Sequence, residues 1–259
     1  MGKIPLSVAI ITKNEEGNIL PCLQSISFAQ QIVVVDSGST DKTLEIAAGF
    51  DCEIYSEEWR GFGLQKQLAI EKCRLPWILV LDADERIPPA TADIIKKIVT
   101  DPDVRQAGFS FPRKNYFQGR WIKHAGWWPD RIVRLFRKDE GKMSEAVVHE
   151  SVVVRGDIGS LDVVIEHYTE SRLSKIIRKI DRYSTLGAET AFKEGKSSTT
   201  GGAFLRAFFT FIQDYFFRLG ILDGMPGLTL AVTDSVNKFF KYAKLSELSK
   251  TNRGVVNDR

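Results

Sequence analysis

The chain has 259 residues, 43% hydrophobic and 27% charged, a composition ordinary for a globular protein with one α/β domain and an appendage. The formal net charge of +3 is small and no motif combines basic with aromatic residues, so nucleic acid is not an expected partner. No run of 18 apolar residues is free of charge and the N-terminus leads directly into an apolar run, so neither a membrane-spanning helix nor a signal peptide is expected.

The first eighty residues alternate between strand-like and helix-like patterns. Four apolar runs predict strands, at residues 6–11, 32–35, 52–55 and 77–81. Apolar residues at helical spacing separate them, at residues 19–26, 44–48 and 64–72. Ser39 or Thr40 is expected to cap the second helix. Strands that alternate with helices indicate βαβ units and a mostly parallel sheet.

An acidic triplet ends the fourth predicted strand. Asp82 and Asp84 stand two residues apart, so in extended chain they project to the same side of the sheet edge, where α/β folds bind ligands. Two carboxylates this close repel each other unless a cation lies between them, and a divalent metal that bridges to a phosphate meets this need. The alternative is a solvated pair of aspartates in a turn.

Three segments together resemble a known family, at residues 7–15, 33–41 and 81–85. In sequence and spacing they are similar to the family 2 glycosyltransferases of the GT-A fold. Four further segments resemble the bacterial lipopolysaccharide-core glucosyltransferases of the WaaE/KdtX type, at residues 127–131, 148–150, 220–224 and 241–244. The resemblance implies a mixed, mostly parallel sheet flanked by helices. It also implies inverting transfer of a hexose, glucose from UDP-glucose, to a lipid-linked glycan such as the lipopolysaccharide inner core.

The resemblance also assigns roles to single residues. Thr12, Asn14 and Glu15 would line the nucleotide, and Asp84 would hold Mg²⁺ or Mn²⁺ on the diphosphate. Further nucleotide contacts are implied for Asp36 at the base, Gln65 or Lys66 near the base or the diphosphate, and Asp82 at the ribose or the sugar. For Asp36 the alternative is an aspartate that caps a helix or closes a turn.

The middle of the chain predicts two more strands, at residues 108–113 and 131–136. The loop between them is rich in tryptophan and glycine, which suits either a sugar pocket or a cover over the sheet. Arg131 and Arg134 are candidates to clamp phosphates of the donor or acceptor, since guanidinium groups bind phosphate bidentately. One of the two arginines could instead be a structural ion-pair partner.

Inverting transfer requires a base that takes the proton from the acceptor hydroxyl. Similar family 2 enzymes carry the base after the acidic triplet, but this chain lacks their common Glu-Asp pair, which leaves the base open among Asp130, Glu145 and Glu150. Glu150 is favoured because it stands beside His149. His149 is in turn a candidate metal ligand, or lies near the diphosphate.

The last ninety residues have a different character, so we expect a catalytic domain at 1–168 and a helical extension at 169–259. Residues 195–202 resemble a flexible linker, and phenylalanines beside basic residues at 204–219 suit a helix in a membrane interface. Alternatively, these aromatics dock the helices onto the catalytic domain or onto a second subunit, which would make a homo-oligomer. The expected location is the cytoplasmic face of the inner membrane, bound peripherally.

Two other functions fit parts of the pattern. A sugar-phosphate nucleotidyltransferase also combines a nucleotide-binding α/β sheet with acidic metal ligands, although the glycine-rich loop of that class is missing after the first strand. A non-catalytic, membrane-associated scaffold on the same fold is the third hypothesis.

Overall fold

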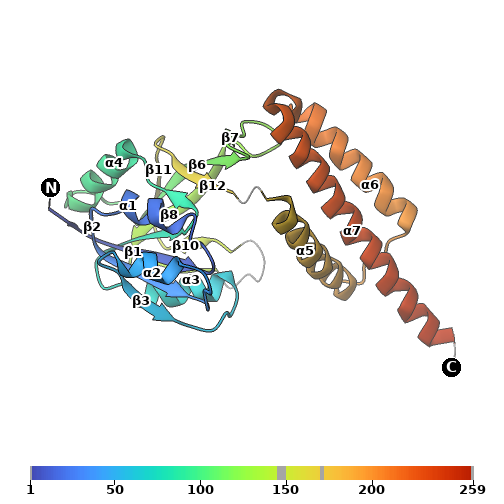
Figure 1. The fold of residues 1–259 in the computed structure, drawn as a ribbon, viewed down its shortest axis with the longest axis horizontal. Helices are drawn as coiled ribbons and strands as arrows, with labels where there is room; N and C mark the ends of the chain where they lie inside the picture. Colours follow the sequence, from blue (N-terminus) through green and yellow to red (C-terminus); the bar gives the residue numbers. More distant parts are fainter. Residues whose placement is uncertain (1, 145–149, 170–171, 258–259) are drawn as a thin grey trace. The chain divides into compact units, whose positions relative to one another are not determined.

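The computed structural model describes residues 2–144, 150–169 and 172–257, with side chains described as far as residue 250. The chain folds into two compact units (Figure 1). Unit 1 comprises Met1–Lys114 and Pro129–Tyr168, and unit 2 comprises Asn115–Trp128 and Thr169–Arg259. The tryptophan-rich loop predicted between two strands therefore belongs largely to unit 2.

Unit 1 is built on a mixed sheet in which four neighbouring strands are parallel, so the predicted α/β class is confirmed. The parallel strands are, in spatial order, β3 (Glu53–Ser56), β2 (Ala29–Asp36), β1 (Ile4–Thr12) and β4 (Trp77–Asp82). The sheet continues through β8 (Asp130–Arg137), β6 (Gly108–Phe117), β12 (Ile165–Tyr168) and β5 (Glu85–Arg86). The short strands β7 (Arg120–Trp121), in unit 2, and β11 (Ile158–Ser160) both pair with β6, while β9 (Gly141–Met143) and β10 (Val152–Val154) form a separate hairpin.

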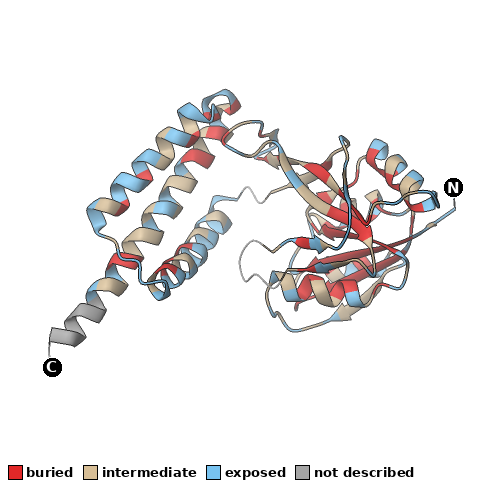
Figure 2. Ribbon diagram, turned by 180° about the vertical axis from the view of Figure 1, so that it is seen from behind, coloured by how far each residue is buried: buried red, intermediate tan, exposed pale blue. Residues whose placement is uncertain are grey.

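Both faces of β1, β2 and β4 are buried, which explains their continuous apolar runs. On β1, Leu6, Val8 and Ile10 join the core on one face, while Ala9 and Ile11 join the core on the other. The first core includes residues of α1 (Ile19–Ser25), α2 (Thr43–Ala48) and α4 (Pro89–Thr100). The second core includes residues of α3 (Phe62–Glu71) and of the β9–β10 hairpin. Figure 2 shows these strands as the most continuously buried part of the chain.

The predicted cap of the second helix was wrong. Helix α2 begins only at Thr43, whose backbone N–H donates to Oδ1 of Asp41 at 3.0 Å. Ser39 and Thr40 are engaged elsewhere: the Ser39 hydroxyl donates to Asp36, and the Thr40 backbone N–H donates to Asn14. The Ser39 hydroxyl also accepts from the Asn14 backbone N–H at 2.8 Å, so Ser39 and Thr40 join the two sheet-edge loops, while Asp41 binds the first residue of α2.

Unit 2 is helical, as the sequence predicted for the C-terminal part. Its helices are α5 (Leu173–Lys193), α6 (Thr200–Ile212) and α7 (Gly224–Asn257), with a π-helical turn at Gln213–Phe217 and a 3₁₀ turn at Gly220–Asp223. Helices α5 and α6 both pack on α7. In the part of the chain that the structure describes, no helix combines the length and apolarity needed to cross a membrane.

The linker predicted at 195–202 is shorter than expected. Helix α6 already begins at Thr200, because the Thr199 side-chain oxygen accepts a hydrogen bond from the Gly202 backbone N–H at 3.1 Å. This N-cap satisfies one of the free donors of the first turn, so two glycines enter the helix despite their low propensity.

Candidate active site

The strand order brings most of the predicted site residues to one edge of the sheet. Thr12 is in register with Asp36, and Ile11 is in register with Asp82, so the ends of β1, β2 and β4 meet. Strand β8 runs antiparallel to β4, so its first residues lie beside the end of β4. Carboxyl ends of parallel strands are where α/β sheets bind ligands.

The loops after β1 and β2 are hydrogen-bonded to each other. Asn14 adopts a left-handed backbone conformation with φ of 56°, and its Oδ1 accepts from the Thr40 backbone N–H at 2.7 Å. The Glu15 backbone N–H donates to Oγ1 of Thr43 at 2.8 Å. These contacts fix the predicted nucleotide-lining loop before any ligand is bound.

Asp36 is buried and closes its own turn. Its Oδ2 accepts from the backbone N–H groups of Gly38 and Ser39, both at 2.9 Å, which matches the turn-capping alternative. Beside it, the hydroxyl oxygens of Thr12 and Ser37 are buried and have no partner among the residues that the structure describes. Buried hydroxyls are usually hydrogen-bonded, so these two groups suit contacts with a bound ligand.

A continuous series of ion pairs runs across the sheet edge, and we call it the ion-pair chain. It consists, in spatial order, of Glu150, Lys66, Asp82, Arg134, Glu85, Arg113 and Asp130. Lys66 Nζ lies 2.8 Å from Asp82 Oδ1 and 3.7 Å from Glu150 Oε1. The ion-pair chain thus connects two of the three candidate bases, Glu150 and Asp130, to Asp82, the aspartate predicted to bind the ribose or the sugar.

Arg134 forms the centre of the ion-pair chain. Its Nη2 lies 2.7 Å from Asp82 Oδ2 and 2.6 Å from Glu85 Oε1. Burial alone would disfavour the charged form of Asp82, but the attraction of Lys66 and Arg134 outweighs it and lowers the pKa of the carboxyl below its ordinary value. Asp82 is therefore held ionised between two cations.

The far end of the ion-pair chain holds Asp130. Arg113 donates to Asp130 Oδ2 from Nε at 2.8 Å, and its Nη1 lies 3.3 Å from Glu85. Burial would lower the pKa of Arg113, but Glu85 and Asp130 outweigh burial and raise it. Asp130 therefore sits against a permanent cation, whereas Glu150 has its 3.7 Å contact with a lysine.

Asp84 faces a histidine that was not predicted as a site residue from the sequence. Its Oδ2 lies 3.2 Å from Nε2 of His167, because β12 pairs antiparallel with β5 and aligns His167 with Glu85. Both side chains are partly exposed. A carboxylate oxygen and an imidazole nitrogen this close together are donor types that Mn²⁺ or Mg²⁺ sites use. Among the described residues, no group of three or more acidic, histidine or cysteine side chains forms a complete metal site.

The remaining predicted residues are placed as follows. Gln65 is fully buried, and its side chain is hydrogen-bonded at 3.4 Å to the backbone of Glu57 and of Arg60, just before α3. Arg131 binds Ser160, Leu161 and Asp162 rather than the ion-pair chain. Glu145 and His149 lie outside the described residues.

A family model described as "Glycosyl transferase family 2" matches residues 7–159, which include every described member of this site except His167. The chain belongs to glycosyl transferase family 2. This confirms the family resemblance, and the protein is a glycosyltransferase. The matched segment begins in β1 and ends in β11.

Relatives of this family 2 glycosyltransferase extend the similarity into unit 2. It is 32% identical to the lipopolysaccharide core biosynthesis glycosyltransferase LpsC of Rhizobium meliloti, over 94% of this chain and 92% of that protein. It is 26% identical to an uncharacterised glycosyltransferase of Rickettsia typhi, over 97% and 90% of the two chains. A solved structure of S. aureus TarS with UDP-GlcNAc aligns at 14% identity over 97% and 92% of the chains, with a TM-score of 0.46.

Three residues of the site were not assigned a role from the sequence: Glu85, Arg113 and His167. Glu85 belongs to the acidic segment at residues 81–85, and its side chain is fully buried. It accepts from the Asp82 backbone N–H at 3.1 Å and binds Arg134, so it positions the motif. Arg113 and His167 reach the site because their strands pair with neighbours far away in the sequence, so no local sequence pattern could have identified them.

Proposed function

We propose that this family 2 enzyme transfers a hexose, glucose from UDP-glucose in the first instance, with inversion, to a lipid-linked glycan such as the lipopolysaccharide inner core. The observation that carries the proposal is the relationship to LpsC, whose name describes lipopolysaccharide core biosynthesis and which matches 94% of this chain. Both units are thus included in the similarity, and the acceptor class is carried over with it.

The donor nucleotide is proposed to bind over the ends of β1, β2 and β4. Thr12, Asn14, Glu15 and Asp36 would form the wall toward the base, where the free Thr12 hydroxyl supplies a hydrogen-bond donor. Lys66 and Arg134 would supply positive charge for the diphosphate, as cations near a departing phosphate stabilise the charge that develops there. Asp82, held ionised between them, would accept from hydroxyls of the ribose or the sugar.

Asp84 and His167 are proposed to hold a divalent ion, Mg²⁺ or Mn²⁺. Their donor atoms are 3.2 Å apart and partly open to solvent, which leaves room for ligands from a donor diphosphate and from water. Bound there, the metal would neutralise charge on the leaving diphosphate. His149, the earlier candidate ligand, is outside the described residues, so His167 takes its place in the proposal.

Glu150 is proposed as the base, with Asp130 and Glu145 as the alternatives. The base would remove the proton from the acceptor hydroxyl. At the same time the hydroxyl oxygen would attack the anomeric carbon of the sugar, and the bond from that carbon to the diphosphate oxygen would break. A carboxylate at 3.7 Å from Lys66 can exchange that contact for a substrate hydroxyl more easily than Asp130 can leave Arg113. This contrast favours Glu150.

Unit 2 is proposed to bind the cytoplasmic face of the inner membrane. Large apolar side chains are exposed along α6 and the turn that follows, among them Phe204 (63%), Phe209 (64%) and Phe217 (80%). Arg206 and Arg218 lie in the same segment. Exposed aromatics beside basic residues are typical of helices that lie in a membrane interface, and Figure 2 shows how much of unit 2 is exposed.

Nucleotide release from UDP-, GDP- and dTDP-sugars, with Mg²⁺ or Mn²⁺, tests this function. The proposal predicts release from one UDP-sugar that disappears in Asp84→Ala, while Lys193→Gln, an exposed change at the end of α5, behaves as wild type. Binding of the same sugars is measured in parallel. Failure to bind any nucleotide sugar, with or without metal, would overturn the proposal and favour a scaffold.

A further inference from the structure

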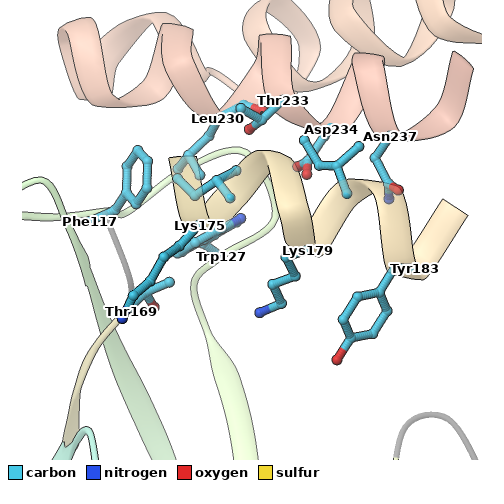
Figure 3. Close-up of a pocket in the computed structure, with 12 residues that line it drawn as sticks. Phe117, Trp127, Thr169, Lys175, Lys179, Tyr183, Leu230, Thr233, Asp234 and Asn237 are labelled. Atoms are coloured by element: carbon cyan, nitrogen blue, oxygen red, sulfur yellow. The ribbon is translucent and has the colours of Figure 1, made fainter. Parts of the chain in front are cut away.

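Unit 2 contains a cavity of its own, of about 250 Å³. It is lined by residues of α5, by residues of α7, and by Phe117, Trp127 and Thr169 (Figure 3). All of its lining residues belong to unit 2. A cavity of this size is large enough for a sugar ring.

Two acceptor groups in this cavity have no hydrogen-bond partner among the residues that the structure describes. Asp234 is largely buried, and no hydrogen bond or ion pair joins its carboxylate to a residue that the structure describes; burial and the nearby Asp214 raise its pKa to about 6. One turn further along α7, Oδ1 of Asn237 is buried and likewise has no partner in the described part of the chain. Figure 3 shows both side chains extending from α7 toward α5.

The Asn237 oxygen is buried and the Asp234 carboxylate is partly exposed, so a ligand that displaces water from this cavity must bring hydrogen-bond donors for both. A lipid tail has none and would leave both groups unsatisfied. Hydroxyl groups of a saccharide donate to carboxylate and amide oxygens, and Trp127 and Tyr183 add aromatic surface for the apolar face of a sugar ring.

The opposite wall of the cavity carries positive charge. Lys175 and Lys179 stand one helical turn apart on α5 and both line the cavity. Figure 3 shows the Lys179 side chain extending from α5 away from Asp234, so its ammonium group lies at the α5 side of the cavity, where it favours a ligand with a phosphate or carboxylate substituent. Donor hydroxyls, an apolar ring face and an anionic group together describe an acidic or phosphorylated saccharide.

We propose that this cavity of unit 2 is a binding subsite for an anionic saccharide part of the acceptor, with Asp234 and Asn237 accepting from its hydroxyls and Lys179 binding its anionic group. The inference rests on the proposed function, because it takes the saccharide to be part of the glycan that receives the sugar. Unit 2 would then recognise the acceptor, through the side chains of Asp234, Asn237 and Lys179.

Calorimetric titration with a deacylated, phosphorylated oligosaccharide of the lipopolysaccharide core tests this subsite, without nucleotide and at pH 7.5. We expect Asp234→Asn to weaken binding about tenfold, since a hydrogen bond to a charged group is lost, and Lys179→Gln about threefold. The matched controls Glu194→Gln and Lys193→Gln, both exposed near the end of α5, should bind as wild type does. Asp84→Ala should also retain binding, and enzymatic removal of the phosphates should weaken binding to wild type but not to Lys179→Gln.

Equal affinity of wild type, Asp234→Asn and Lys179→Gln would overturn the subsite, as would absence of binding to wild type. If nucleotide release from a UDP-sugar persists in either case, the proposed function stands and only the subsite fails. If wild type binds neither a nucleotide sugar nor the oligosaccharide, the proposed function itself fails and the subsite with it. Far-ultraviolet circular dichroism of each variant shows that loss of binding is not loss of the fold.

Discussion

Arg134 lies between two carboxylates, one of which, Glu85, is fully buried. Removing its guanidinium would leave Glu85 and Asp82 with mutual repulsion and with less compensation for their burial. The positions of Asp82 and Glu85 in the ion-pair chain therefore depend on Arg134. The neighbouring Arg131, on the same strand, makes exposed contacts instead.

Arg134→Met is expected to lower the free energy of unfolding by about 3–5 kcal/mol, the range for breaking one partner out of a buried ion pair. Arg131→Met is the matched control and should cost less than about 1 kcal/mol, because its partner Asp162 is fully exposed. Urea unfolding followed by tryptophan fluorescence measures both. Similar costs for the two variants would contradict the central place of Arg134.

His167 provides a second prediction at this scale. If it shares a divalent ion with Asp84, His167→Ala should weaken Mn²⁺ binding to the nucleotide-bound protein about tenfold or more, since one of two protein ligands is lost. Electron paramagnetic resonance of free Mn²⁺ reports the binding directly. His124→Ala is the control, because His124 pairs with Asp223 in unit 2. An unchanged Mn²⁺ affinity in His167→Ala would remove His167 from the metal site.

At the scale of elements, Asp234 determines a pH-dependent contribution of α7. The folded protein holds its proton up to about pH 6, whereas the unfolded chain releases it near 3.8, so ionisation at neutral pH opposes folding. The groups that face it are Asp214, Arg218 and Lys238, with Lys175 and Lys179 across the cavity.

Asp234→Asn should therefore raise the free energy of unfolding at pH 7.5 by up to about 3 kcal/mol, and the gain should vanish as the pH falls to 4. Asp181→Asn, which changes an exposed aspartate on α5, should show no such gain. Thermal unfolding between pH 4 and 8 measures the difference. A variant that is more stable yet binds saccharide less well would identify Asp234 as a group kept for binding rather than for folding.

The elements themselves were largely predictable from the sequence, because buried parallel strands and amphipathic helices leave local periodic patterns. The strands at 77–81 and 131–136 and the acidic triplet between strand and loop were identified in this way. Helix ends were less predictable. Several hydroxyl and acidic residues precede α2, and the contacts of Ser39 and Thr40 with Asn14, a residue far away in the sequence, leave Asp41 to bind the first residue of the helix.

The site was predictable only where a motif is continuous in sequence. Asp82, Asp84 and Lys66 are close to the ends of predicted elements, and the structure brings Asp82 and Lys66 into contact. His167 reaches Asp84 only because β12 pairs with β5, a contact between segments far apart in the chain. Arg134 rather than Arg131 enters the site because residues three positions apart on a strand project to opposite faces. Which of the two faces the site depends on the register of β8 with β4.

At the scale of the whole molecule, the exposed aromatic side chains of unit 2 predict membrane binding. The triple variant Phe204→Ser, Phe208→Ser and Phe217→Ser should sediment with phosphatidylglycerol-containing vesicles much less than wild type, while its stability changes little because these side chains are exposed. Phe62→Ser changes an exposed aromatic of unit 1 and is the control. Unchanged sedimentation of the triple variant would exclude this surface as the membrane contact.

Transfer of labelled hexose from a UDP-hexose to truncated lipopolysaccharide, with wild type beside Asp84→Ala, tests the proposed reaction most directly. We expect label in the lipid fraction with wild type only, and a product whose anomeric configuration, determined by nuclear magnetic resonance, is opposite to that of the donor. Retained configuration, or full transfer by Asp84→Ala, would contradict the mechanism assigned to this site.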